Sequence, residues 1–300
     1  MPSNQPRSLT RTDIVILWAC RIAWVLLAVV GGSAFSDALD GRTALLRWIA
    51  GVALWALFAV CFVAMAVTST ATLTMVRLLL PVGVAVCVIA AASGATAVHA
   101  AVALALAAIA LVTGFSSEFA RIFVQQSAYG DETRLPLRLP VPFILPLTLG
   151  WIAAAGPLVS GLLLVGAHEW IAGGVLTVAG VAASRQLRAS FHRFSRRWLV
   201  FVPSGVVIHD QLVLAETAMV LNTAIVGVGL APVGSGAADL TGGTTGPRLE
   251  VQLAESETFV YAADSKNPQG RAIHATGVMI SPSRPGRALA ESARRTLPII

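Results

Sequence analysis

Long apolar runs separated by short polar segments make up the first 183 residues of the chain. A helix needs about 20 apolar residues to cross the hydrocarbon core of a bilayer. Five of the runs reach that length and a sixth is shorter, so the pattern predicts an α-helical polytopic membrane domain with six spans. The predicted spans are 14–35, 44–67, 73–92, 95–115, 141–165 and 170–183.

The sixth run is the least certain span because it is short and rich in glycine. Runs of about 10 to 14 apolar residues are often re-entrant or interfacial segments, which is the alternative for 170–183. The fifth run has a different peculiarity, since Pro136, Pro140, Pro142 and Pro146 crowd its start. Proline disrupts a regular helix, so we expect either a helix that begins only after Pro146 or a kinked entry into the span.

The pattern changes after residue 198, where short runs rich in valine and isoleucine are separated by glycine, proline and serine. Such runs predict the strands of a mainly-β soluble domain. The predicted strands are 198–202, 205–210, 218–228, 248–254, 258–263 and 272–280. A Gly- and Thr-rich loop is expected at 233–247, and a last helix at 286–296.

A basic segment, RQLRASFHRFSRRW at 185–198, joins the two parts of the chain. Leu187, Phe191, Phe194 and Trp198 would form one stripe of a helix, with basic side chains around the rest, as in helices that lie at a membrane surface. One hypothesis is that its arginines bind anionic lipid headgroups. The simpler alternative is a stop-transfer anchor that only fixes topology. The candidate headgroup ligands are Arg185, Arg188, Arg193, Arg196 and Arg197.

Charge sets the expected orientation. The chain has 21 Lys and Arg against 15 Asp and Glu, and only 12% of its residues are charged. The basic residues gather in the N-terminal tail, in the 116–140 loop and in the basic segment. Positive residues favour the cytoplasmic side, so six spans with both termini cytoplasmic fit the distribution, in a plasma-membrane protein. This placement explains the net charge of +6 without nucleic-acid binding.

Ionisable residues inside the predicted spans are few. Arg21, Arg47, Arg77 and His99 lie in spans, and no Asp or Glu lies in the middle of one. Intramembrane charge usually marks a transport or proton pathway, and its scarcity argues against a coupled carrier. A further segment, 116–127, carries a helical apolar stripe that predicts a short helix along the cytoplasmic interface.

Catalytic and metal-binding patterns are not evident in the sequence. Cys20, Cys61 and Cys87 lie inside apolar runs, where a thiol behaves as a small hydrophobic group. His209-Asp210 stands without further ligands at metal spacing, and GGTTGPR at 242–248 lacks the lysine of a phosphate-binding loop. We therefore expect no catalytic, cofactor-binding or metal-binding residues, and no enzyme.

Two stretches of the soluble part resemble a known family. RRWLVFVPSGVVIHD (196–210) is similar to the opening hairpin of bacterial pleckstrin-homology-like (PH-like) domains, and ISPSRPGRALAESARR (280–295) is similar to their closing strand and helix. The resemblance implies a bent β-sandwich with a C-terminal helix. Taken whole, the chain resembles integral membrane proteins of actinobacteria. The expected organisation is a tail (1–13), a six-helix membrane domain (14–183), a basic hinge (184–198) and a cytoplasmic PH-like domain (199–300).

These patterns favour a non-enzymatic membrane protein that scaffolds, assembles or regulates a membrane complex. Its expected partners are membrane lipids, with anionic headgroups at the hinge, and other membrane proteins. The main alternative is a transporter or permease-like component with a regulatory cytoplasmic domain, and a third is a membrane enzyme that acts on lipids. A transporter would need a mid-membrane cavity lined by Arg21, by His99 or by the proline-rich start of the fifth span.

Overall fold

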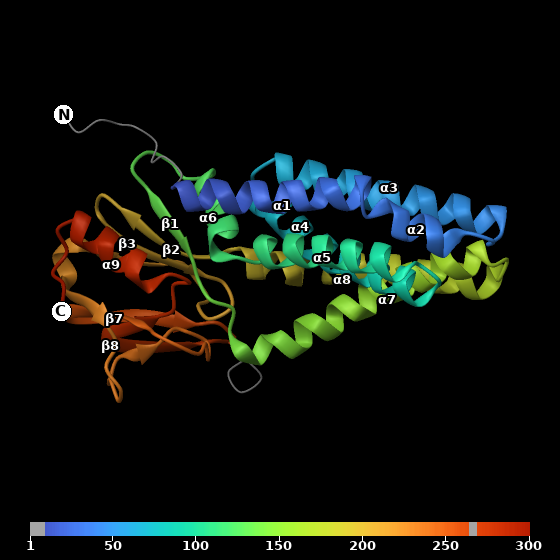
Figure 1. The fold of residues 1–300 in the computed structure, drawn as a ribbon. Helices are drawn as coiled ribbons and strands as arrows, with labels where there is room; N and C mark the ends of the chain where they lie inside the picture. The colour runs from blue at the N-terminus through green and yellow to red at the C-terminus, as the bar shows by residue number, and fades with distance from the viewer. Residues whose placement is uncertain (1–9, 264–268) are drawn as a thin grey trace. The chain divides into compact units, whose positions relative to one another are not determined.

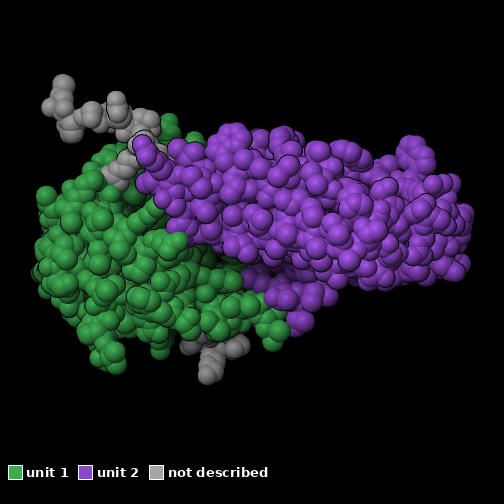
Figure 2. Space-filling model, viewed as in Figure 1, with its two compact units in different colours: residues 1–8, 124–145, 192–300 green, residues 9–123, 146–191 purple. Residues whose placement is uncertain are grey.

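The computed structural model describes residues 10–263 and 269–300 and divides into two compact units. The membrane unit comprises residues 9–123 and 146–191 (Figure 2, purple). The β-rich unit contains the described residues of 124–145 and 192–300 (Figure 2, green). Two separate segments of the described chain therefore form the β-rich unit, and the first of them lies between two long apolar helices.

The membrane unit is helical (Figure 1). Five of its segments are long and apolar enough to cross a membrane, which makes the chain a membrane protein. They are Arg11–Leu39, Ala44–Ala66, Thr70–Ala92, Ala97–Gly114 and Val141–Gly166. The helices of the unit are α1 (Arg11–Val29), α2 (Gly32–Leu39), α3 (Ala44–Ala66), α4 (Thr70–Ala92), α5 (Ala97–Gly114), α6 (Ser117–Gln125, to residue 123), α7 (Ile144–Gly166, from residue 146) and α8 (Trp170–Ser195, to residue 191).

The first predicted span is two helices rather than one. A capping box starts α1, since the hydroxyl of Thr10 accepts from the backbone N–H of Asp13 and the carboxylate of Asp13 accepts from that of Thr10. The helix ends at Val29, and α2 begins at Gly32 after a break at Gly31. A Cβ at Gly31 would lie 2.7 Å from the carbonyl oxygen of Leu27, so the break requires glycine.

The segment predicted as the sixth span is the start of α8. This helix is not among the five that meet the length and hydropathy expected of a span. It continues without a break from Trp170 to Ser195, through most of the predicted hinge. Arg185, Arg188 and Arg193 therefore belong to the same helix as the apolar run before them, whereas Arg196 follows the helix and Arg197 begins the next strand.

The proline-rich start of the fifth span differs from the prediction. A 3₁₀ turn, η1 (Val141–Phe143), leads directly into α7, which begins at Ile144. The expected start after Pro146 is wrong, because a proline in the first turn of a helix removes only an N–H that has no partner within the helix.

The β-rich unit contains two four-stranded sheets (Figure 1). The first is antiparallel in the order β1-β2-β3-β4 and the second runs β5-β7-β8-β6, with β6 parallel to β8. The strands are β1 (Thr133–Pro136), β2 (Arg197–Val202), β3 (Gly205–Asp210), β4 (Ala218–Leu221), β5 (Ile225–Leu230), β6 (Ala238–Asp239), β7 (Leu249–Tyr261) and β8 (Arg271–Ile280). Helix α9 (Pro285–Arg294) follows β8.

Several strands follow the predicted ranges, and three details differ. The predicted strand 218–228 is β4 and β5, separated by the 3₁₀ turn η2 (Asn222–Ala224). The strands predicted at 248–254 and 258–263 form one long strand, β7, whose pairing with β8 shifts register between Gln252 and Glu257. Strand β1 was not predicted.

One hydrophobic core holds the β-rich unit together. Both sheets contribute fully buried side chains to it, among them Phe201, Ile208 and Leu249. Ala288 of α9 and Leu297 beyond it are part of the same cluster. The C-terminal helix therefore packs into the core of the unit rather than extending from it.

Candidate functional site

The five candidate headgroup arginines have different environments. Arg185, Arg188 and Arg193 are exposed on α8, and Arg196 is half-buried just after it. The Nη2 of Arg193 donates to the carbonyl oxygen of Gln211 at 2.8 Å. Arg197 differs from these four, because it is buried in the β-rich unit.

Arg197 forms a buried ion pair with Asp210. The two residues lie opposite each other in the register of β2 and β3. Nε and Nη2 of Arg197 donate to Oδ1 and Oδ2 of Asp210, both at 2.7 Å, and the two side chains are 2% and 0% exposed. Nη1 donates to the carbonyl oxygen of Arg138 at 2.6 Å. This bidentate geometry makes Arg197 a structural residue of the β-rich unit.

An aromatic cluster lies on the same hairpin. The rings of Trp198 and His209 stack with centroids 4.8 Å apart, and the guanidinium of Arg134 on β1 lies 5.8 Å from the Trp198 centroid. Burial lowers the pKa of His209, and the positive charge of Arg196 lowers it further. This histidine is therefore held neutral at pH 7, so it adds no positive charge to a headgroup site.

Two of the ionisable residues predicted inside the spans, Arg21 and His99, form hydrogen bonds within the membrane unit. Arg21 donates from Nη2 to the carbonyl oxygen of Met65 at 2.6 Å. His99 Nδ1 lies 2.6 Å from Oδ2 of Asp37, which also accepts from the backbone N–H of Thr96 at 3.0 Å. These bonds join neighbouring helices and give Arg21 and His99 a structural role.

The predicted interfacial helix also packs inside the protein. The stripe of α6 is buried, with Phe119 and Phe123 both 0% exposed and their ring centroids 4.6 Å apart. Arg121 of α6 forms an ion pair with Asp13 of α1, whose side chain is fully buried. The stripe that predicted contact with lipid is thus a core contact, which the sequence pattern alone cannot distinguish.

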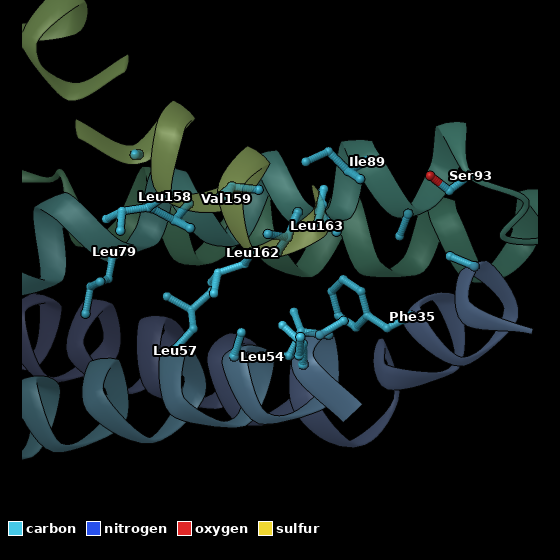
Figure 3. Close-up of a pocket in the computed structure, with 18 of the residues that line it drawn as sticks. Phe35, Leu54, Leu57, Leu79, Ile89, Ser93, Leu158, Val159, Leu162 and Leu163 are labelled. Atoms are coloured by element: carbon cyan, nitrogen blue, oxygen red, sulfur yellow. The ribbon is translucent and has the colours of Figure 1, made fainter. Parts of the chain in front are cut away.

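A cavity of about 640 Å³ lies within the membrane unit (Figure 3). Its volume is in the range of small-molecule binding sites. The labelled side chains of Figure 3 are all apolar except Ser93. The lining residues are Phe35, Ala38, Leu39, Arg42, Leu46, Ile49, Ala50, Ala53, Leu54, Leu57, Leu78, Leu79, Val82, Val86, Ile89, Ala90, Ser93, Trp151, Ala154, Ala155, Leu158, Val159, Leu162, Leu163, Ser184 and Phe191.

Hydrogen bonds join α7 to two other parts of the membrane unit. Near one end of the helix, the indole N–H of Trp151 donates to the carbonyl oxygen of Leu78 on α4 at 3.0 Å. At the other end, the hydroxyl of Thr43 donates to the carbonyl oxygen of Gly166 at 3.0 Å. A second cavity of about 260 Å³ shares Phe35, Leu54 and other side chains of its wall with the first.

Neither Arg21 nor His99 lines these cavities. The prolines at the start of the fifth span do not line them either, so these two cavities have none of the three features expected of a transport site. The sequence did not predict this cavity, because its walls are mostly Leu, Val and Ala residues, which are common throughout apolar helices.

In comparisons with known proteins, no family model, no curated protein and no solved structure matches the chain.

Proposed function

We propose that the chain is a non-enzymatic, multi-pass plasma-membrane protein that scaffolds or regulates a membrane complex through a cytoplasmic β-rich domain. The observation that carries this proposal is the pairing of β1 with β2, from Thr133↔Phe201 to Pro136↔Trp198. One sheet is built from two segments that are separated in the sequence by α7 and α8.

This pairing supports a sixth crossing. Two strands of one sheet lie on the same side of the membrane, so the chain between them crosses an even number of times. Helix α7 belongs to one of the five segments suited to spanning, and α8 would supply the return. With α8 counted there are six crossings, which places both termini on one side. The basic residues at 134, 138 and 185–197 favour the cytoplasm for that side.

The arrangement of the β-rich unit supports a PH-like domain. Two packed sheets, an opening hairpin at β2 and β3, and a C-terminal helix in the core match the features that the resemblance implied. The unit departs from that pattern in one respect, because β1 comes from a loop between membrane helices. The domain would then be held at the membrane by three chain connections, after α6, before α7 and after α8.

The chemistry of the membrane unit supports scaffolding over transport of polar solutes. A polar substrate needs several converging polar groups, whereas the large cavity is lined almost wholly by apolar side chains.

The exposed arginines Arg185, Arg188 and Arg193, with Arg196, remain proposed contacts for anionic lipid headgroups. Each would contribute about 1 kcal/mol near an anionic surface.

The outer strand β4 offers a contact surface for a partner. Met219 and Leu221 are 48% and 53% exposed, while Val220 between them is buried in the core. Outer strands with exposed apolar side chains readily associate with other chains. A partner protein of the complex would bind here by covering these two side chains.

A pull-down from native membranes in mild detergent tests the proposal. We expect the full-length protein to recover a defined partner in a constant ratio, and the M219K/L221K double variant to lose most of it. The matched control is E255K, which also adds positive charge at an exposed position of β7. Recovery of the chain alone, or equal partner recovery by the wild type and M219K/L221K, would contradict the scaffold.

A further inference from the structure

We propose that the 640 Å³ cavity of the membrane unit binds one acyl chain of a phospholipid and that Arg42 contacts the phosphate of that lipid. The site takes one lining side chain, Phe191, from the basic segment but none of its arginines, and it does not depend on the scaffold role.

The lining is suited to a saturated hydrocarbon chain. Leu54 and Leu57 of α3 face the cavity from one side, and Leu158, Leu162 and neighbouring residues of α7 face it from the other (Figure 3). An alkyl chain from the surrounding lipid would gain dispersion contacts with these side chains. Ser93 and Arg42 are the polar residues at the end where α4 stops.

The cavity is at least as long as the hydrocarbon of one leaflet. Its wall on α3 runs from Leu46 to Leu57, and its wall on α4 runs from Leu78 to Ser93. At about 1.5 Å per residue these walls are roughly 16 and 22 Å long. The hydrocarbon of one leaflet is about 15 Å thick, half of the bilayer core. A single acyl chain whose headgroup lies at Arg42 therefore fills the cavity along its axis.

Arg42 is placed to bind an anion. It is exposed in the turn between α2 and α3, and its Nη2 donates to the carbonyl oxygen of Ser93 at 3.1 Å. That bond directs the guanidinium to the cavity end and uses one of its five N–H donors. In the described part of the chain, Arg42 has no carboxylate within ion-pair distance. The nearby Asp37 instead bonds with His99 and Thr96. A phosphate would supply the missing counter-charge.

Other occupants fit the cavity less well. A polar solute would leave its hydrogen-bonding groups against alkyl side chains, which is costly. The chemistry of the walls thus selects an alkyl chain, and the charge at Arg42 selects one with an anionic headgroup.

Photo-crosslinking of the full-length protein tests the acyl-chain contact. The protein is reconstituted with a phosphatidylglycerol that carries a diazirine in its acyl chain, and labelled peptides are mapped by mass spectrometry. A53F and A155F fill the cavity from α3 and α7. Their controls are A59F and A153F, which add the same ring at exposed positions of the same helices outside the cavity.

We expect labelling of the cavity walls to fall about fivefold or more in A53F and A155F and to stay unchanged in A59F and A153F. Size-exclusion profiles identify variants that misfold, and the two cavity-filling positions are independent. Labelling spread evenly over the lipid-exposed helices, or unaffected by either filled variant, would overturn the proposal.

The phosphate contact is tested by native mass spectrometry of the protein with three separate probes: phosphatidylglycerol, diacylglycerol and inorganic phosphate. We expect phosphatidylglycerol to be retained about fivefold more strongly than diacylglycerol and inorganic phosphate not to be retained. R42Q should remove that fivefold difference, which corresponds to about 1 kcal/mol for one basic residue. R47Q is the control, because Arg47 is also exposed near the start of α3 but lies outside the cavity. Equal retention of diacylglycerol, binding of free phosphate, or no effect of R42Q would overturn this contact.

Discussion

Replacing Asp210 by Ala is expected to destabilise the β-rich unit by about 3–5 kcal/mol, because it leaves the buried guanidinium of Arg197 without its carboxylate. Both side chains are almost fully enclosed, and two bonds of 2.7 Å join them. The reciprocal variant R197M should cost a similar amount by leaving Asp210 unpaired. A loss of this size is a large share of the stability of a small domain.

Limited proteolysis and thermal unfolding of the detergent-purified protein measure this loss. The double variant R197M/D210L should recover most of the stability, since an apolar pair can replace a buried ion pair at little cost. The R193Q variant is the control, because Arg193 is exposed and makes one bond to Gln211. If R197M were no less stable than R193Q, the structural role of Arg197 would be wrong.

Placing valine at Gly161 or Gly173 is expected to force α7 and α8 apart. A Cβ at Gly161 would lie 2.6 Å from the backbone nitrogen of Thr177, and one at Gly173 would lie 2.6 Å from that of Val165. Backbone atoms of a helix cannot move aside as a flexible side chain can. The close approach of the two helices depends on these glycines, and overpacking of this kind costs about 1–3 kcal/mol or more.

The neighbouring Gly174 provides a matched control, since a Cβ at that position has no atom within 4 Å. Thermal stability in detergent should fall in G161V and G173V and stay near the wild-type value in G174V. Equal stability of all three variants would mean that α7 and α8 do not approach each other as described.

The sequence predicted the positions of helices and strands better than it predicted which of them pair or pack together. Five apolar runs form helical segments that are long and apolar enough to span a membrane, because length and hydropathy can be read from the sequence. Strands β2, β3 and β8 lie within about two residues of the predicted ranges. Strand β1 was not predicted, because its sequence, TRLP, is only four residues long and contains a proline. Such a strand is defined only by its pairing with β2.

The candidate site shows the same limit. The pattern around Arg197 indicated a helix surface, whereas its role depends on its register opposite Asp210, which only the fold reveals. The cavity is a property of the spacing between helices, and alanines such as Ala53 and Ala155 that line it are equally typical of tight packing. Helical periodicity predicted the buried stripe of α6 but could not tell lipid from protein as its neighbour.

Cysteine accessibility in intact cells tests the central claim, that the two segments of the β-rich domain lie on one side and that α7 and α8 both cross. Single cysteines are placed at the exposed positions Tyr129, Ala167 and Val233. The native Cys20, Cys61 and Cys87 are buried and give little background. A membrane-impermeant maleimide should label A167C in intact cells, and Y129C and V233C only after permeabilisation. Labelling of Y129C and V233C from opposite sides, or of A167C from the same side as V233C, would contradict it.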